Sequence, residues 1–350
     1  MNNITLLIHG PFAGNFLDSI YQNYCKVSQK ISETIIVCYQ DDYESYCEYL
    51  KKTPQWNIKL VTVKDIINPG FFNINRQIMT VRAGIKNASG SFIIKLRNDQ
   101  CVNFQKLFSI LEKHNYFSEE PQKIITTNCY TRKDRLYHPS DMFLCGNHEA
   151  VKKYFSVPLM QETHLDHQLF LQQLGQKTNL KYFSLPVVPE SYLFRNYIKK
   201  QGWKIKETPK DSFNALKKYT FLINSWDIDF RWVKARNPYL NAKSIILPSF
   251  FNIKPFEGMP KEKARCYNAH QLGCKKLSLK DIYYITLSRV LFNLKYKNIG
   301  KKCKLKTKKQ LLSFMRLILK IFPYMLAKPL DEKIQKKIRK YKTKITSMQC

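Results

Sequence analysis

Short apolar runs alternate with longer amphipathic stretches over the first hundred residues. The apolar runs are rich in β-branched residues and predict strands at 4–9, 34–39, 58–63 and 91–96. The stretches between them predict helices at about 15–30, 44–51 and 75–87. Strands and helices that alternate at these lengths favour a mostly parallel sheet with helices on its faces. The pattern therefore predicts an α/β protein.

In such a sheet a ligand usually lies beyond the carboxyl ends of the strands. Residues 10–15, 39–42 and 97–101 follow three of the predicted strands and are the segments where a site is expected. The first begins with Gly10-Pro11, a turn whose backbone N–H groups are suited to approach a phosphate. It matches neither common glycine-rich phosphate motif, so a plain tight turn is the favoured interpretation.

Charge narrows the choice of partner. The 350 residues include 59 Lys and Arg against 26 Asp and Glu, a formal net charge of +33, while 44% of the residues are apolar. The apolar content is sufficient for a folded core and excludes a disordered chain. The positive charge predicts an anionic partner, namely nucleic acid, acidic lipid headgroups or a phosphorylated small molecule.

The charge is concentrated near the C-terminus. Residues 295–350 hold 18 Lys and Arg against two acidic residues, which is +16 of the total. This asymmetry predicts a catalytic domain at 1–245 and a basic, mainly helical region at 246–350. Ten scattered cysteines without a C-x-x-C pair predict reduced, mostly buried thiols, and the start of the chain lacks a signal-peptide pattern. Both observations favour a cytoplasmic location.

The most informative chemistry lies in residues 73–101. A helix with Arg76 and Gln77 leads into a glycine-bearing turn, and an apolar strand then delivers Arg97 and Asp99 to its carboxyl end. This order resembles nucleotide-sugar glycosyltransferases of the GT-A (Rossmann-like) fold, with a basic helix, G-I-x-x-A-x-G, an apolar strand and D-x-D. The residues in register with that pattern are Gly84, Ile85, Ala88, Gly90 and Asp99.

Arg97 stands where the resemblance places the first Asp of D-x-D. In GT-A enzymes those carboxylates hold a divalent metal against the donor diphosphate. An arginine neutralises a diphosphate directly and contacts it with two N–H groups. Two options follow: Mn²⁺ or Mg²⁺ on Asp99, or a metal-independent enzyme in which Arg97 performs the metal's electrostatic work.

A narrower resemblance rests on three segments, Gly10–Phe12, Asn73–Gln77 and Lys95–Asp99. They resemble the WavE-type lipopolysaccharide synthesis family of bacterial glycosyltransferases, in which K-x-R-x-D replaces D-x-D. The resemblance covers residues 1–240 and implies a nucleotide-sugar donor and a lipopolysaccharide or other surface-glycan acceptor. It implies a donor site formed by Gly10, Pro11, Asn75, Arg76, Gln77, Lys95, Arg97 and Asp99. Each of three residues also has a purely structural interpretation. Arg76 could be a solvated helix residue, Lys95 a strand residue whose charged end reaches the rim of the sheet, and Asp99 a residue that caps a turn.

An inverting transfer needs a general base that removes the acceptor proton. Asp166 matches the aspartate of the "E-D-x-x-L" segment of inverting GT-A enzymes and is the first candidate. Asp141, which precedes an apolar strand that resembles the acceptor-side strand, is the second. Glu162 and His167 are alternatives, and an ordinary charge in a first helical turn explains Asp166 nearly as well.

The C-terminal region resembles a surface anchor. A lysine tract at 301–309 leads into an apolar helix at about 310–327 with a narrow polar stripe. Its charges and its proline argue against a spanning helix, which needs ~20 mostly uncharged residues. We expect an interfacial helix on an anionic membrane surface, with a helix packed on the catalytic domain as the alternative.

Together these features predict a glycosyltransferase, of inverting type, on the cytoplasmic face of a bacterial inner membrane. It would transfer a sugar from a nucleotide sugar to a lipid-linked oligosaccharide or lipopolysaccharide. A sugar- or polyol-phosphate transferase is one alternative. A non-enzymatic nucleic-acid-binding protein is another, but no RRM, OB, helix-turn-helix or zinc signature is present in the sequence, so nucleic acid is the least favoured partner.

Overall fold

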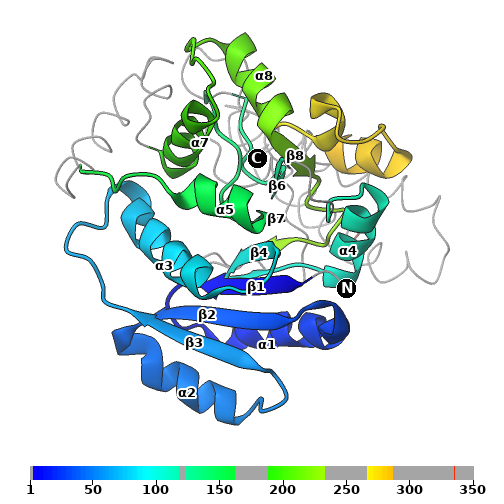
Figure 1. Ribbon diagram of the computed structural model, residues 1–350. Helices are drawn as coiled ribbons and strands as arrows, with labels where there is room; N and C mark the ends of the chain where they lie inside the picture. The colour runs from blue at the N-terminus through cyan, green and yellow to red at the C-terminus, as the bar shows by residue number, and fades with distance from the viewer. Residues whose placement is uncertain are drawn as a thin grey trace, which may run out of the picture. The chain divides into compact units, whose positions relative to one another are not determined.

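The first apolar run forms β1 (Ile4–His9), an interior strand of a seven-stranded sheet (Figure 1). The computed structural model describes residues 3–117, 123–133, 135–161, 188–232, 266–286 and 335. All six residues of β1 are buried, as expected for a parallel strand covered by helices on both faces. The chain divides into two compact units, 1–282 and 283–350, and nearly all described residues belong to the first.

The other strands of the main sheet are β2 (Glu33–Tyr39), β3 (Ile58–Val63), β4 (Phe92–Arg97), β6 (Ile124–Thr127), β7 (Leu144–Asn147) and β8 (Thr220–Ile223). Strands β5 (Gln100–Cys101) and β9 (Arg231–Trp232) form a separate antiparallel pair. The α-helices are α1 (Gly14–Cys25), α2 (Tyr43–Lys51), α3 (Ile74–Asn87), α4 (Phe104–Lys113), α5 (His148–Phe155), α7 (Pro189–Lys200) and α8 (Pro209–Tyr219). Short 3-10 helices are η1 (Ser28–Lys30), η2 (Gln40–Asp42), η3 (Phe71–Asn73) and η5 (Ala269–Leu272).

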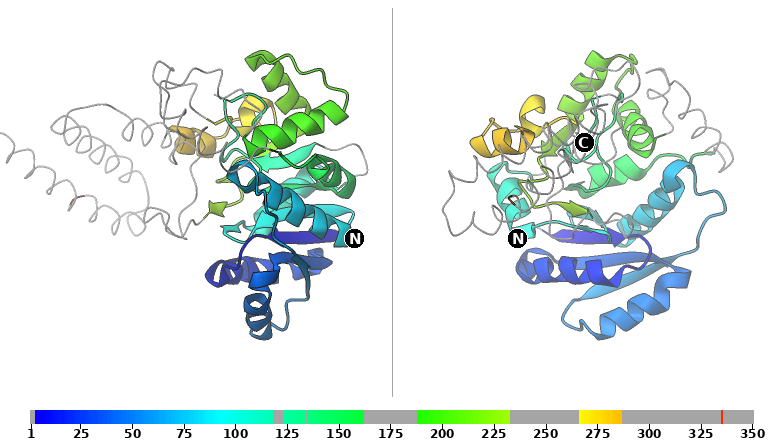
Figure 2. Two further views of the ribbon diagram at one scale, coloured as in Figure 1. Left: turned by 90° about the vertical axis from the view of Figure 1, so that its left-hand side faces the viewer. Right: turned by 180° about the vertical axis from the view of Figure 1, so that it is seen from behind.

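The strands of the main sheet lie in the order β3-β2-β1-β4-β7-β6-β8, and the direction in which successive strands are added changes next to β1. From β1 the chain proceeds outward to β2 and β3, then returns to place β4 on the other side of β1. Because parallel crossovers are right-handed, this reversal places α1 and α2 on one face and α3 on the other (Figures 1 and 2). A crevice is expected at such a switch point, outside the carboxyl ends of β1 and β4.

Strand β7 runs antiparallel to both of its neighbours, β4 and β6. Leu144 pairs with Lys95, so the residues that precede β7 lie at the edge where β4 ends. Asp141 therefore approaches the same edge of the sheet as Arg97, although the two residues are 44 positions apart in the sequence.

The predicted α/β class, with a mostly parallel sheet flanked by helices, is confirmed. The first four strands lie within one residue of their predicted positions. Most of the described cysteines are buried, as predicted; they are Cys38, Cys129, Cys145, Cys266 and Cys274. Within the described residues, none of the helices combines the length and apolarity that crossing a membrane requires.

Residues 266–282 pack against the carboxyl ends of β6 and β8 in the first unit. Asp281 is fully buried there and accepts hydrogen bonds from Asn224 Nδ2 and Trp226 Nε1, both at 2.9 Å. Ser278 and Asp281 also cap each other reciprocally through side chain and backbone. The predicted boundary between 245 and 246 and the predicted helix at 310–327 lie outside the described residues.

Candidate active site

A cavity of about 390 Å³ opens at the predicted switch point. The last residue of β1, the last residue of β2 and the last residue of β4 meet there with the first turns of α3. Its lining is His9, Gly10, Pro11, Tyr39, Asp65, Phe72, Asn73, Arg76, Gln77, Thr80 and Arg97. Five of the predicted donor-binding residues are therefore brought together; they are Gly10, Pro11, Arg76, Gln77 and Arg97. The volume lies within the range of about 300–1,000 Å³ that is usual for small-molecule sites.

The turn after β1 has a fixed shape. Gly10 has a φ of +126°, and a Cβ atom at this position would lie 2.7 Å from Asn98 Oδ1. Tyr46 donates a hydrogen bond to Gly10 O at 3.1 Å and accepts one from Asn98 Nδ2 at 3.0 Å. The glycine is thus required for close approach of the backbone to Asn98. The Asn98 of the K-x-R-x-D segment supports this turn.

The opposite wall is formed by a loop with left-handed backbone. Phe72 and Asn73 have φ values of 52° and 62°, a conformation that asparagine tolerates better than most residues. Asn73 Oδ1 accepts a hydrogen bond from Arg76 Nη1 at 3.0 Å, which fixes that guanidinium beside the pocket. Phe72 is 46% exposed and lines the cavity, so an aromatic residue is accessible at this wall.

Both arginines of the pocket form bidentate pairs with aspartates. Arg97 donates to Asp99 through Nε at 3.0 Å and Nη2 at 2.8 Å. Arg76 donates to Asp65 through Nε at 2.8 Å and Nη2 at 2.5 Å, and these bonds hold the pKa of Asp65 below its usual value. Asp99 orients the Arg97 side chain, and the Nη1 edge of Arg97 has no hydrogen bond to any residue described by the structure.

The carboxylates at this pocket do not fit a divalent-metal site. Mn²⁺ and Mg²⁺ need several free oxygen ligands, whereas both oxygens of Asp65 and of Asp99 accept guanidinium N–H groups. Among the described residues, no group of three His, Cys, Asp or Glu side chains is placed to hold a metal ion.

Three predicted donor-binding residues lie outside the pocket lining, namely Asp99, which pairs with Arg97, and the buried Asn75 and Lys95. Asn75 is buried and bonds to the backbone of Met160, through Nδ2 at 2.7 Å and Oδ1 at 2.7 Å. Lys95 is also buried; its ammonium donates to Asp141 O at 2.6 Å, and burial lowers its pKa to about 8. Both side chains are engaged within the protein, and a direct contact with the donor stays a prediction.

A cluster of titratable groups that the sequence did not reveal lies on the Asp141 side of Lys95. Glu190, at the start of α7, lies 3.5 Å from His138 Nε2. Burial and the nearby Asp141 raise the pKa of Glu190 to about 8. Burial, together with Arg135 and Arg132, holds the pKa of His138 well below its usual value. No local motif marks these residues, because they are separated by about fifty positions and meet only in the fold.

The predicted base candidates divide between the described and undescribed parts of the chain. Asp141 is 9% exposed and lies beside Lys95, near the end of β4. Asp166, Glu162 and His167 lie outside the described residues. The role of each as a base stays a prediction.

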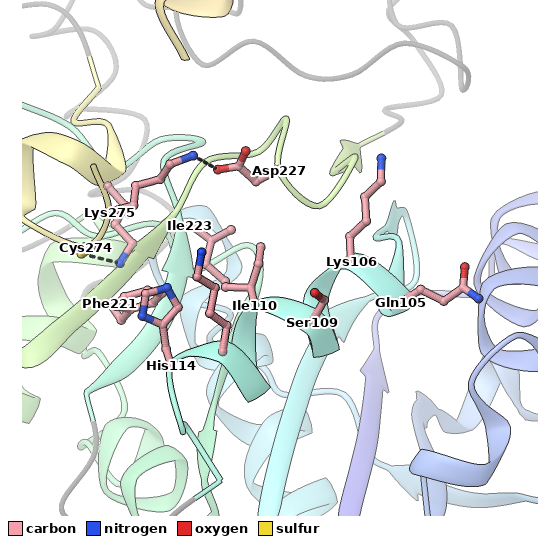
Figure 3. Close-up of a pocket in the computed structure, with 12 residues that line it drawn as sticks. Gln105, Lys106, Ser109, Ile110, His114, Phe221, Ile223, Asp227, Cys274 and Lys275 are labelled. Atoms are coloured by element: carbon pink, nitrogen blue, oxygen red, sulfur yellow. Dashed lines mark hydrogen bonds and ion pairs between the residues drawn. The ribbon is translucent and has the colours of Figure 1, made fainter. Parts of the chain in front are cut away.

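A second cavity, of about 460 Å³, lies between α4 and β8 and contains none of the predicted site residues (Figure 3). Lys275 is paired with Asp227 at 2.8 Å, and the His114 ring lies against Phe221 with centroids 5.0 Å apart (Figure 3). The described residues that line this second cavity include neither an arginine nor a glycine turn, whereas the first cavity has both.

The fold is an α/β architecture with a mostly parallel sheet flanked by helices, as the sequence predicts. The chain belongs to the WavE lipopolysaccharide synthesis family, whose model matches residues 52–230, just over half of the chain. Membership of this family indicates a role in lipopolysaccharide synthesis.

The solved structures that a structural comparison matches to this chain have low sequence identity to it. The 4-diphosphocytidyl-2C-methyl-D-erythritol synthase of Anaerococcus prevotii has a TM-score of 0.38 and 11% identity, covering 68% of this chain and 92% of its own. The mannosyltransferase PcManGT of Pyrobaculum calidifontis, in complex with GDP-Man and Mn²⁺, has a TM-score of 0.34 and 10% identity, covering 62% and 75%. Glucosyl-3-phosphoglycerate synthase of Mycobacterium tuberculosis, with Mn²⁺, UDP and phosphoglyceric acid, has a TM-score of 0.33 and 9% identity, covering 50% and 65%. A sequence search of curated proteins gives no match.

Proposed function

We propose that the cavity between β1, β4 and α3 binds a nucleotide-sugar donor, and that the enzyme transfers its sugar to a lipopolysaccharide or lipid-linked oligosaccharide acceptor. The observation that carries this proposal is the position of Arg97. It lies in a cavity at the switch point of a parallel sheet, beside the Gly10-Pro11 turn and within reach of the first turns of α3. Membership of the WavE family supports the acceptor class.

Arg97 stabilises the diphosphate leaving group in this proposal. Negative charge accumulates on the leaving oxygen as the sugar departs, and a fixed cation in a partly buried site stabilises that charge in the transition state. Asp99 holds the Nε and Nη2 edge of Arg97, which leaves the Nη1 edge for phosphate oxygens. Arg76 is held by Asp65 and Asn73 in the same way on the other side. We therefore propose that transfer proceeds without a divalent metal.

The cavity presents aromatic side chains to which the nucleoside half of the donor can bind. Tyr39, at the end of β2, and Phe72, in the left-handed loop, both line the cavity. A nucleobase stacked on an aromatic side chain gains about 1–3 kcal/mol. We assign the base to this wall and the diphosphate to the arginines.

The acceptor proton passes to a carboxylate in the proposed inverting reaction. Asp166 and Asp141 are the candidates, and Asp141 approaches the end of β4 because β7 is antiparallel to it. Asp166→Asn and Asp141→Asn separate the two: the variant of the true base loses turnover by a factor of about 100 or more at unchanged donor affinity. If both variants retain full turnover, neither residue is the base.

Donor binding is tested by thermal unfolding with UDP, GDP, CDP, ADP and dTDP and their common sugar conjugates, each with EDTA and with Mn²⁺. We expect one nucleotide class to stabilise the wild type in EDTA. Arg97→Met should abolish the shift, whereas Lys30→Met should retain it because Lys30 forms an exposed pair with Glu112 away from the cavity. Stabilisation that appears only with Mn²⁺ would contradict a metal-independent donor site.

A further inference from the structure

His9 ends β1 with a side chain that is 5% exposed and lines the candidate donor cavity. It was not among the residues that the sequence predicted for the site. Its neighbour across the parallel ladder is Arg97, which pairs with it directly. Directly paired residues on adjacent strands project from the same face of a sheet, so the imidazole and the guanidinium lie side by side.

The hydrogen bonds around Thr80 favour one tautomer of His9. His9 Nδ1 lies 3.2 Å from Thr80 Oγ1. The single hydroxyl proton of Thr80 is directed to backbone carbonyls, Arg76 O at 2.8 Å and Gln77 O at 3.1 Å. The nearest acceptor for that proton is Arg76 O. With the proton directed there, the hydroxyl oxygen accepts from the imidazole, the His9 proton lies on Nδ1, and Nε2 carries a bare lone pair.

Nε2 of His9 is buried and has no hydrogen-bond partner among the described residues. Burial, Lys95 and Arg97 all lower the pKa of His9, so the ring is neutral near pH 7. A buried acceptor without a partner destabilises the protein by itself. Its position in a cavity lining gives the lone pair a use when a ligand is bound.

We propose that His9 Nε2 accepts a hydrogen bond from a hydroxyl group of the bound nucleotide sugar, which makes His9 a specificity-determining residue of the donor site. This inference rests on the proposed function. The pairing of His9 with Arg97 points to a hydroxyl donor. If Arg97 contacts the diphosphate, the groups on either side of the diphosphate are the ribose and the transferred sugar, and both carry hydroxyls. The nucleobase lies further away, beyond the ribose.

The proposal is tested by comparing wild type with His9→Phe and His9→Gln. Phenylalanine keeps a flat ring but removes the acceptor, and glutamine keeps an acceptor oxygen. The ligand is the nucleotide that stabilises the wild type in the screen above. It is used in four forms: the nucleoside diphosphate, its 2′-deoxy and 3′-deoxy analogues, and the sugar conjugate. Titration calorimetry measures the affinity of each protein for each form. We expect His9→Phe to bind the nucleotide sugar at least tenfold more weakly than wild type does. The unfolding temperature of the ligand-free variant should be equal to or above that of the ligand-free wild type. His9→Gln should recover part of the lost affinity.

The ligand series identifies the source of the hydroxyl. If a ribose hydroxyl donates, the wild type loses affinity for one deoxy nucleotide and His9→Phe shows no further loss with it. If the transferred sugar donates, the loss in His9→Phe appears only with the sugar conjugate. Equal affinity of wild type and His9→Phe for every ligand would overturn the inference while the donor site remains. If no nucleotide binds the wild type, the proposed function itself fails.

Discussion

The charged residues in and directly after strand β4 differ in how far they are buried. Arg97 is 38% and Asp99 17% exposed at the side chain, and exposed pairs of this kind contribute only about 0–1 kcal/mol to stability. The main physical effect of the pair is to hold one guanidinium edge in place. Lys95 lies two positions earlier on the same strand and therefore on the same face, but it is buried below the cavity.

Glu190 gives a pH dependence with a defined sign. Its pKa is raised from 4.5 to about 8, so between these values the folded protein keeps a proton that the unfolded chain has lost. The contribution of this group to the free energy of unfolding therefore falls as pH rises through that window, by about 1.4 kcal/mol per pH unit. Glu190→Gln should be more stable than wild type at pH 7.5, with the difference shrinking toward pH 5.

Urea unfolding from pH 5.5 to 7.5 measures that difference. The exposed Glu149→Gln is the matched control and should follow the wild type at every pH, because Glu149 is 64% exposed. A Glu190→Gln variant that is less stable than wild type at pH 7.5 would show that the carboxyl is ionised and paired in the fold.

A residue could be assigned to the site from the sequence when its position at the end of a predicted strand determines where it lies in the fold. Arg97 and Gly10 end or follow strands, and the carboxyl ends of parallel strands meet at one edge. His9 ends a strand as well, but its unpaired Nε2 depends on Thr80, 71 positions away. The proximity of Glu190 and His138 depends in the same way on tertiary packing. Such proximity leaves no local signal in the sequence.

At the scale of elements, two glycines of the G-I-x-x-A-x-G segment allow close packing. Gly84 faces β1 and β2 from α3, and a Cβ atom there would overlap Leu7 Cδ1. A Cβ atom at Gly90 would lie 2.5 Å from Thr5 Oγ1 and 2.6 Å from Thr5 N. The motif thus positions α3 and β4 against β1, and through them Arg76 and Arg97.

Gly84→Ala should reduce the free energy of unfolding by about 1–3 kcal/mol, because an added methyl forces α3 away from β1. The removal of Leu7 Cδ1 makes room for the methyl, so the loss in Gly84→Ala/Leu7→Ala should be smaller than the sum of the two single losses. Chemical denaturation of the four proteins measures this coupling. Strict additivity would show that Gly84 does not pack on Leu7.

Element positions were predicted well where apolar runs of six residues alternate with helices, as in the first four strands. The direction of β7 was not predicted. That strand has four residues, and its antiparallel pairing with β4 and β6 is determined by long-range contacts rather than by its own pattern. The approach of Asp141 to the site depends on this direction.

At the scale of the whole molecule, Asp281 attaches residues 266–282 to the rest of the first unit. It is fully buried, pairs with Lys275 at 3.1 Å, and its pKa is held well below the usual value by hydrogen bonds from Ser278 and Trp226 that outweigh burial. Asp281→Ala leaves Lys275 and Asn224 without that carboxylate and should cost about 3–5 kcal/mol. Urea unfolding at pH 7 measures the loss. A cost near that of the exposed Glu149→Ala would contradict the role of this contact.

The net charge of +33 has its largest local excess in residues 295–350. If this region anchors the enzyme to a membrane, its lysines contribute about 1 kcal/mol each near an anionic surface. Removal of residues 300–350 should then abolish cosedimentation with vesicles that contain phosphatidylglycerol. Binding of the full chain should weaken at high salt and be absent on neutral vesicles. Equal cosedimentation of the full and shortened chains would refute the anchor.

Turnover in EDTA shows whether Arg97 replaces a metal ion in sugar transfer. With the nucleotide sugar identified by the screen and a lipopolysaccharide acceptor, release of the nucleoside diphosphate is measured for wild type, Arg97→Lys and Arg97→Met in excess EDTA. We predict full wild-type turnover, a loss of about tenfold or more in Arg97→Lys, which lacks the bidentate pair with Asp99, and a larger loss in Arg97→Met. Wild-type turnover that is lost in EDTA and restored by Mn²⁺, with Arg97→Met as active as wild type, would contradict this role of Arg97.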